Sequence, residues 1–326
     1  MKHIFLIITV LTTLQINVLK AQTFEYIEYP YPVNEFHFII ESVSGNMAYM
    51  DVKPAVSNGR TVLLLHGKNF NGYYWKNVIA SLSDSGYRVI APDQIGWGKS
   101  SYPNIHYSFH LLSRCTKQLL DSLGITFMGS KIEIIAHSMG GMLGTRFALM
   151  YPESVDKLIL ENPIGLEDYK TFVPYRTVDE QFQKELSATY ESYKKYRQSY
   201  YPVWKPEYEE LVKVQASVLK YAMFKDIAFV NAVTYEMIYE QPVVYEFKDL
   251  KVPVYFIIGK EDRTIVGKDL LSKEMQESHG QVVILARDLV QKIPVASIIE
   301  FPGVGHIPHI QEPEMFMNTV FSILEK

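Results

Sequence analysis

Short runs of apolar and β-branched residues alternate along the chain with longer stretches of helical periodicity. Residues 61–65 read Thr-Val-Leu-Leu-Leu, a nearly continuous apolar run that is typical of a strand buried on both faces. Strands are predicted over residues 35–40, 47–53, 61–65, 87–92, 131–136, 156–161, 252–258 and 296–301, and helices over residues 73–83, 109–123, 141–150, 282–290 and 313–326. This alternation predicts an α/β fold with a doubly wound, mostly parallel sheet.

The alternation stops between residues 166 and 247. This stretch lacks the pattern of a buried strand and holds amphipathic helical stretches, for example over residues 179–197 and 206–218. We therefore expect a helical cap at 166–247, inserted into an α/β core formed by residues 22–165 and 248–326. An insertion at this point lies above the carboxyl edge of the sheet, so its residues would form the roof of a pocket there.

Tyrosine is the distinctive residue of this insertion, which holds 12 of the 23 tyrosines. Four of them recur at helical spacing: Tyr190, Tyr193, Tyr196 and Tyr200. We expect these four to pack a helix against the core. Three others flank turns or later helices: Tyr175, Tyr235 and Tyr239. These three are candidates to present ring faces and hydroxyl tips to a small, partly apolar substrate.

The N-terminus has the order of residues found in secretory signals. Residues 1–3 read Met-Lys-His, residues 4–14 are mainly apolar, and residues 20–22 read Lys-Ala-Gln. The apolar run is short for a membrane span and polar residues interrupt it. We expect a signal peptide over residues 1–21, a periplasmic or secreted mature protein, and no stable membrane anchor after cleavage.

The charge balance argues against a nucleic-acid partner, and the cysteine content limits disulfides and metal sites. The formal net charge is −4, with 32 basic and 36 acidic residues, so the basic stripe that nucleic-acid binding needs is not expected. Cys115 is the single cysteine, which excludes an intrachain disulfide and a cysteine-based metal cluster. A small molecule is the expected partner, and the sequence is silent on oligomeric state.

Ser138 lies where a predicted strand turns sharply into a predicted helix, within Ala-His-Ser-Met-Gly-Gly at residues 136–141. Such a turn needs small residues beside the central one and exposes the central side chain at the edge of the sheet. Ala136 stands where the G-x-S-x-G pattern has its first glycine, and alanine is small enough for this turn. Ser138 is therefore the candidate nucleophile. The alternative is a serine that only caps the helix, and His137 is interpreted as a packing residue.

His306 is the best placed of the nine histidines to take the proton of the serine. It follows the last predicted strand, in a glycine-containing loop where this fold class has its catalytic histidine. His309 is the competitor. Asp262, after the next-to-last predicted strand, is the candidate acid that orients the imidazole. The alternatives for the acid are Glu261 and Glu161.

A tetrahedral intermediate needs hydrogen-bond donors where its negative charge appears. The backbone N–H of Met139, directly after the nucleophile, is the first candidate. The second is expected in the loop after residues 61–65, where we favour the N–H of Lys68 over that of Asn69.

Five motifs in this order resemble the α/β-hydrolase family: His66-Gly67, residues 93–100, the turn at Ser138, residues 259–262 and Gly305-His306. The resemblance spans residues 49–326. It is strongest to members with a helical cap after the sixth strand, many of which hydrolyse esters, lactones or carbon–carbon bonds of small acids. A serine at 138 disfavours relatives with an aspartate nucleophile, such as dehalogenases and epoxide hydrolases. The resemblance implies no cofactor and no metal.

The candidate residues and the resemblance together imply a carboxylesterase-like serine hydrolase that cleaves a small-molecule ester through an acyl-enzyme. The same three residues also serve cleavage of an amide or a carbon–carbon bond, so these alternatives stay open. Haloperoxidase or transferase activity would be a side reaction of the same site. A non-catalytic binding protein with this fold is the alternative from another class, and loss of the serine, histidine or acid would have favoured it.

The signal-peptide hypothesis predicts where the exported protein begins. In its native host the mature chain should start near Gln22, because signal peptidase cleaves after a small residue and Ala21 is small. Intact-mass measurement of the purified native protein checks this expectation. A mass that includes residues 1–21 would contradict it.

Overall fold

The computed structural model describes residues 28–126, 129–293 and 295–326. The expected signal peptide, residues 1–21, lies outside these ranges. Eight strands form one sheet in the order β1-β2-β4-β3-β5-β6-β7-β8. Their bounds are β1 (Val33–Ile40), β2 (Val43–Val52), β3 (Thr61–Leu65), β4 (Arg88–Pro92), β5 (Ile132–His137), β6 (Val155–Glu161), β7 (Val254–Gly259) and β8 (Ala296–Phe301). β1–β2 and β2–β4 pair antiparallel and the other neighbours pair parallel, which confirms the predicted mostly parallel sheet.

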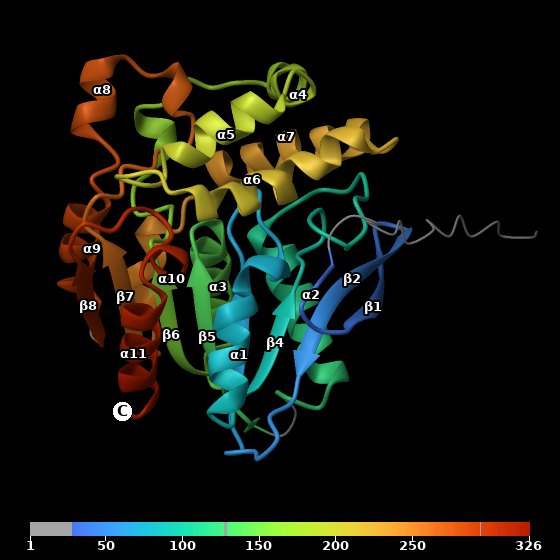
Figure 1. Ribbon diagram of the computed structural model, residues 1–326, viewed down its shortest axis with the longest axis vertical. Coiled ribbons are helices and arrows are strands. Elements are labelled where there is room, and N and C mark those ends of the chain that lie inside the picture. The colour runs from blue at the N-terminus through green and yellow to red at the C-terminus, as the bar shows by residue number, and fades with distance from the viewer. Residues whose placement is uncertain (1–27, 127–128, 294) are drawn as a thin grey trace, which may run out of the picture.

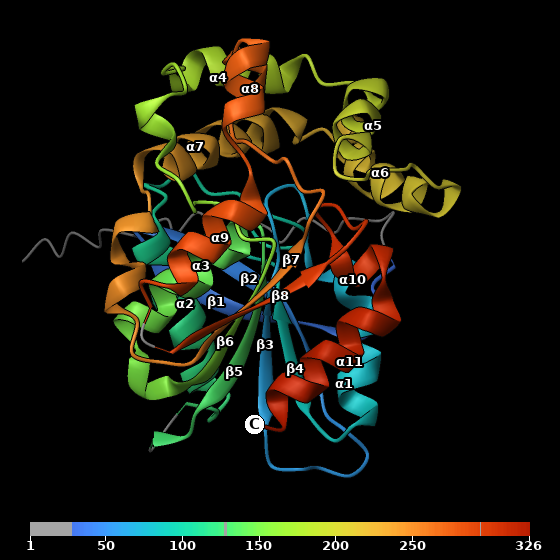
Figure 2. The same cartoon turned by 90° about the vertical axis from the view of Figure 1, so that its left-hand side faces the viewer.

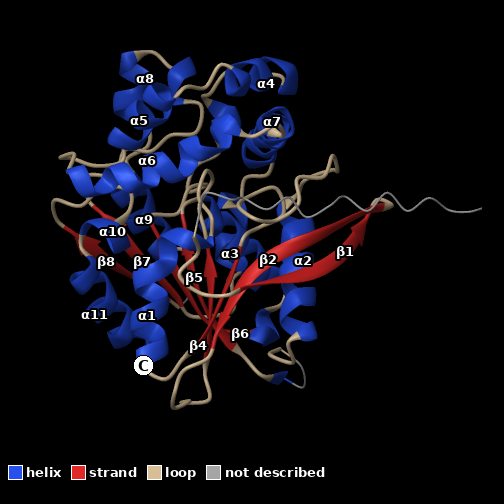
Figure 3. Cartoon of the chain, turned by 45° about the vertical axis from the view of Figure 1, so that its right-hand side comes forward, coloured by secondary structure: helices blue, strands red, loops and turns tan. Residues whose placement is uncertain are grey.

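Helices cover both faces of the sheet (Figures 2 and 3). One face carries α1 (Lys76–Asp84) and α11 (Pro313–Leu324), and the other carries α2 (Phe109–Ser122), α3 (Met139–Met150) and α9 (Val282–Val290). The remaining short helices are η1 (Gly72–Trp75), η3 (Pro152–Ser154), η4 (Tyr169–Thr171), η5 (Pro206–Tyr208), η6 (Ser217–Lys220), η7 (Val244–Asp249), η8 (Lys268–Leu270) and α10 (Pro308–Gln311). Within the described ranges, no helix has the length and apolarity needed to cross a membrane.

The two faces of the sheet belong to two separate hydrophobic cores. Successive side chains of a strand point to opposite faces, so Leu63 and Leu65 of β3 join the core beneath α2 and α3. Val62 and Leu64 join the core beneath α1 and α11. A strand buried in this way needs apolar residues at every position, which explains the continuous apolar run at 61–65.

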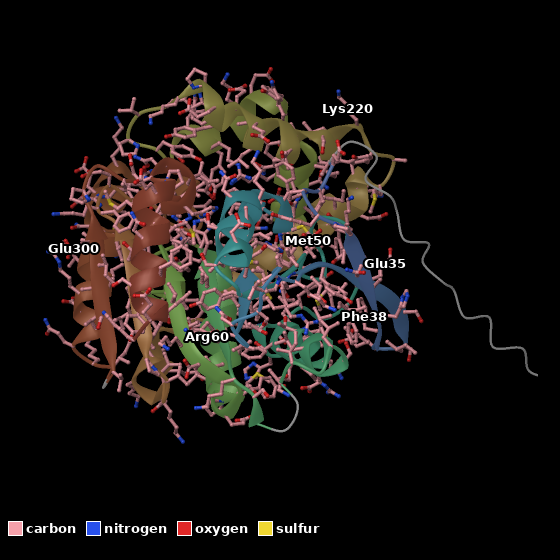
Figure 4. The ribbon with its side chains drawn as sticks, turned by 60° about the horizontal axis from the view of Figure 1, so that its bottom comes forward. Glu35, Phe38, Met50, Arg60, Lys220 and Glu300 are labelled. Atoms are coloured by element: carbon pink, nitrogen blue, oxygen red, sulfur yellow. The ribbon has the colours of Figure 1, made fainter. Side chains whose placement is uncertain are left out.

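The two edges of the sheet carry charged side chains. Figure 4 shows Glu300 of β8 and Glu35 of β1 on opposite sides of the molecule. Glu300 accepts hydrogen bonds from the guanidinium of Arg287, at 2.5 and 2.6 Å. Charge on an edge strand disfavours pairing with a strand of another molecule.

Between β6 and β7 the chain forms four α-helices, α4 to α7, that lie over one end of the sheet (Figure 1). They are α4 (Val178–Leu186), α5 (Tyr190–Gln198), α6 (Glu209–Ala216) and α7 (Phe224–Glu240). The single helical stretch expected over 179–197 is instead divided between α4 and α5. The physical reason is a capping box at the start of α5, in which Thr189 and Ser192 each bond the backbone N–H of the other.

The connection between β7 and β8 also contributes to this end of the molecule. It contains α8 (Lys273–Ser278), which lies at the same end of the molecule as α4 (Figure 1). Asp269 forms ion pairs with Arg176 at 2.6 Å and with Lys184 at 2.9 Å. The ring of His279 stacks on Phe172 at 3.9 Å. The roof therefore includes a second segment that the sequence analysis had assigned entirely to the core.

Candidate active site

Ser138 lies between the end of β5 and the start of α3, at φ 55° and ψ −120°. An L-residue rarely adopts this backbone conformation, so neighbouring groups must hold it. The Ser138 N–H donates to Glu161 O at 3.1 Å, and Ser138 O accepts from the Gly141 N–H at 2.8 Å. A Cβ on Gly140 would lie 2.2 Å from Leu65 O. Only glycine at 140 lets α3 begin so close to the end of β3.

The structure brings Ser138, His306 and Asp262 into one hydrogen-bonded line. His306 Nε2 lies 3.0 Å from Ser138 Oγ, and His306 Nδ1 lies 2.7 Å from Asp262 Oδ2. All three side chains are buried. A neutral imidazole that donates from Nδ1 to the carboxylate leaves Nε2 to accept the serine proton. The geometry is that of a general base beside a nucleophile, and the catalytic roles of the three residues stay predictions.

Asp262 is held as a carboxylate. Its Oδ2 also accepts from Asn162 Nδ2 at 2.7 Å, and its Oδ1 accepts from the Thr264 N–H at 2.9 Å. Burial opposes ionisation, but His306 and these hydrogen bonds together keep the pKa of Asp262 below its ordinary value. The sequence analysis missed Asn162. Its position directly after β6, at the same edge as Ser138, is the signal that could have found it.

The residues considered as alternatives bond to each other instead. His309 Nδ1 lies 2.8 and 2.9 Å from the two carboxylate oxygens of Glu161, and the His309 N–H donates to the same carboxylate at 2.8 Å. The His309 ring stacks on Trp75 at 4.3 Å. Glu161 therefore orients a different imidazole from the one expected. Glu261 is exposed at the surface.

The loop after β3 lies directly against the nucleophile. A Cβ on Gly67 would be 2.9 Å from Ser138 Cβ and 3.1 Å from His137 Nδ1. A turn follows, in which the Phe70 N–H donates to Gly67 O at 3.2 Å and Asn69 has φ 66°. Met139 is the first residue of α3, so its N–H has no acceptor within the helix. The assignment of the oxyanion donors to Met139 and Lys68 stays a prediction.

The side chain of Lys68 connects this loop to the cap. Its Nζ donates to Asn231 O at 2.9 Å and to Thr234 Oγ1 at 3.3 Å, both in α7. Burial lowers the pKa of Lys68 to about 8. The sequence analysis considered only the backbone of this residue.

Tyr200 belongs to a hydrophobic core, as expected, and it also contacts the candidate base. Its ring centroid lies 4.5 Å from that of His306, and its carbonyl oxygen accepts from the His306 N–H at 2.8 Å. It lies two residues beyond α5, so helical spacing alone did not reveal this role.

The three tyrosines expected to face a substrate differ in exposure. Tyr175 is exposed and donates to Glu236, whereas Tyr239 is buried and donates to Val173 O at 3.0 Å. Tyr235 is buried, and a Cβ on Gly267 would lie 2.7 Å from its hydroxyl. Of the three expected to face a substrate, Tyr175 therefore has its hydroxyl at the surface.

No metal-binding arrangement is present in the described part of the chain. There, no group of three or more His, Cys, Asp or Glu side chains is arranged to hold a metal ion.

The sequence profile of the alpha/beta hydrolase fold family matches residues 60–313. The chain belongs to the α/β-hydrolase family. A probable hydrolytic enzyme from Pseudomonas aeruginosa PAO1 is 43% identical to this hydrolase, with a TM-score of 0.88 over 91% of this chain and 96% of that one. The enol-lactonase from Burkholderia xenovorans LB400 has a TM-score of 0.66 over 89% of this chain and 100% of its own, at 19% identity. At that identity the likeness shows the fold alone.

A curated relative of this hydrolase is the cis-3-alkyl-4-alkyloxetan-2-one decarboxylase from Xanthomonas campestris pv. campestris. It is 38% identical over 124 residues, which are 36% of this chain and 39% of that protein. An uncharacterized protein from Mycobacterium bovis is 36% identical over 109 residues, 33% of this chain and 30% of that protein. The chain therefore matches less than half of the length of these two relatives.

Replacement of the two buried carboxylates separates their roles. Asp262→Asn keeps the side-chain shape but removes the charge that orients His306, so kcat on p-nitrophenyl acetate should fall by about 10⁴-fold. Glu161→Gln should lower kcat by less than about tenfold, because Glu161 touches His309 and none of the expected reacting atoms. Initial rates measure both effects, with circular dichroism as the folding control. A severe Glu161→Gln effect beside a mild Asp262→Asn effect would reassign the acid.

Proposed function

We propose that this α/β hydrolase is a serine carboxylesterase that cleaves small-molecule esters through an acyl-enzyme. One observation carries the proposal. Ser138 Oγ, the two nitrogens of His306 and Asp262 Oδ2 form a continuous line with separations of 3.0 and 2.7 Å. This line begins at a strained strand-to-helix turn, the position from which a serine can attack a bound carbonyl.

In the proposed acylation step, His306 Nε2 takes the hydroxyl proton as Ser138 Oγ attacks the ester carbonyl carbon. Asp262 stabilises the imidazolium that forms, and the N–H groups of Met139 and Lys68 donate to the developing oxyanion. His306 then returns the proton to the departing alkoxide. Water, activated by the same imidazole, releases the acid and restores Ser138.

The contacts of the cap with the site favour a small substrate. Tyr200 lies on His306, and Lys68 bonds α7, so the cap is held close to the reacting groups. A small cleft opens next to the site, between the loops after β3 and β4 and the cap. Ser138 and His306 are not among its lining residues. Its lining combines aromatic rings with amide side chains, including Phe70, Trp97, Tyr193, Asn69, Gln215 and Asn231. Such a lining suits a partly apolar small molecule better than an extended lipid.

We further propose that the protein acts in the periplasm or outside the cell, after removal of residues 1–21. The charged, apolar and small-residue order of that segment supports this proposal. A small molecule is the proposed partner.

Removal of the hydroxyl at position 138 tests the nucleophile. Ser138→Ala should abolish hydrolysis of p-nitrophenyl acetate and covalent labelling by a fluorophosphonate, because no other oxygen is bonded to His306 Nε2 among the described side chains. The melting temperature should change little, since alanine fits the same turn. Turnover above about a tenth of the wild-type value would reject the assignment.

A panel of p-nitrophenyl esters from acetate to palmitate tests the substrate class. We expect the highest kcat/KM for short-chain or aromatic acyl groups, because a closely held roof excludes an extended chain. A triglyceride emulsion serves as the control for interfacial activity. Preference for palmitate, or activation by the emulsion, would point to a lipase with a mobile lid instead.

A further inference from the structure

We propose that Tyr74 and His137 are positioning residues, which tie the loop after β3 to the backbone of His306 through one directed chain of hydrogen bonds. The inference rests on the proposed function, because it assigns to these residues the placement of the base and of the oxyanion loop. Neither residue touches the reacting atoms in the proposed mechanism. The sequence analysis had interpreted His137 as packing alone.

Three contacts make up the chain. The Gly67 N–H donates to Tyr74 Oη at 3.0 Å. Tyr74 Oη lies 3.1 Å from His137 Nδ1, and His137 Nε2 lies 2.8 Å from His306 O. The chain therefore joins the loop after β3, the η1 turn, the end of β5 and the loop after β8.

The direction of each hydrogen bond follows from elementary chemistry. A carbonyl oxygen only accepts, so His137 must carry its proton on Nε2 to bond His306 O. A neutral His137 then has a lone pair on Nδ1, and the Tyr74 hydroxyl must donate to it. Tyr74 Oη is left to accept from the Gly67 N–H. Each atom has one role, and the chain cannot be reversed while His137 is neutral.

The surroundings of His137 keep it neutral. Burial lowers its pKa well below the ordinary value, and His306, His309 and Arg197 lower it further. Tyr74 and Glu161 are further titratable neighbours. Glu161 is paired with His137 across β5 and β6, but its carboxylate bonds His309. A second proton on His137 would also remove the acceptor of the Tyr74 hydroxyl.

The hydrogen-bond chain holds two parts of the site in place, the backbone of His306 and the loop after β3. The His306 N–H donates to Tyr200 O of the cap at 2.8 Å, while His306 O accepts from His137 in the core. The backbone of the candidate base is thus held from both sides. Gly67 has no Cβ, which lets the loop lie against Ser138 while its N–H reaches Tyr74. Loss of the Tyr74 hydroxyl would remove the hydrogen-bond partner of two buried groups, the Gly67 N–H and His137 Nδ1.

Tyr74→Phe is the main test, because it removes the hydroxyl and keeps the ring that stacks on Phe70. We expect kcat on p-nitrophenyl acetate to fall by about 10- to 100-fold with KM changed by less than about twofold, since misplacement by about 1 Å has effects of this size. Tyr73→Phe is the matched control. It lies in the same η1 turn and its hydroxyl bonds Glu210 at the surface, so its kcat should stay near the wild-type value.

His137 variants test the other half of the chain. His137→Phe removes both nitrogens and should lower kcat as Tyr74→Phe does. His137→Gln keeps an N–H donor for His306 O and should recover a large part of the loss. The kcat of the double variant Tyr74→Phe/His137→Phe should be no lower than that of the less active single variant, because both substitutions break the same hydrogen-bond chain. Wild-type kcat in both single variants, or additive losses in the double variant, would overturn the proposal.

A measurement on the full wild-type chain tests the hydrogen-bond direction without catalysis. Long-range ¹⁵N–¹H correlation of the imidazoles, assigned by the signal missing from His137→Gln, should show His137 neutral with its proton on Nε2 from about pH 5 to about pH 9. A proton on Nδ1 would overturn the chain. If Ser138→Ala remained active, the proposed esterase mechanism would fail, while this tautomer would still decide whether the chain exists.

Discussion

The close approach of α3 to the end of β3 is the constraint on which the rest of the site depends. Gly140 lies so near Leu65 O that any side chain there would collide with the backbone. This approach forces the chain to turn within one residue, so Ser138 takes a positive φ and its hydroxyl emerges toward His306. Gly67, in the loop after β3, lets that loop contact the same turn, since a Cβ at this position would lie 2.9 Å from Ser138 Cβ. The other parts of the site are arranged around these two glycine contacts.

Buried imidazoles then connect the loops at this edge. Burial lowers the pKa of His66 to about 4, so its ring is neutral and has one donor and one acceptor. His66 Nδ1 donates to Gly67 O at 2.9 Å, and Nε2 accepts from the Gln94 N–H at 2.9 Å. His137 forms the corresponding connection between Tyr74 and His306 O. A neutral imidazole in a dry interior bonds in one direction only, which gives each loop a defined position relative to the nucleophile.

The cap contributes one cation, Arg197, to the same loops. Arg197 is buried and lies 3.7 Å above the ring of Phe70, and its Nη2 donates to Asn69 O at 2.6 Å. Lys68 reaches from the core to the cap, because its side chain extends from the loop after β3 to α7. Tyr200 bonds the backbone of His306. Cap and core are thus joined at two loops, one expected to carry the second oxyanion donor, Lys68, and the other carrying the candidate base, so a change in the cap would act on both.

The sequence by itself determined the order of strands and helices and the candidates Ser138, His306 and Asp262. Hydrophobic periodicity is local, and residues that follow parallel strands share one edge of the sheet, so both could be predicted without coordinates. Tertiary structure alone decided that Glu161 bonds His309, that Asn162 holds Asp262, that Tyr200 covers His306 and that His137 bonds His306 O. His137 and His306 are 169 positions apart, and the direction of their hydrogen bond depends on burial and on neighbours from three other segments. Local sequence patterns do not predict such contacts, because the pairing of donors with acceptors is decided only when distant segments pack together.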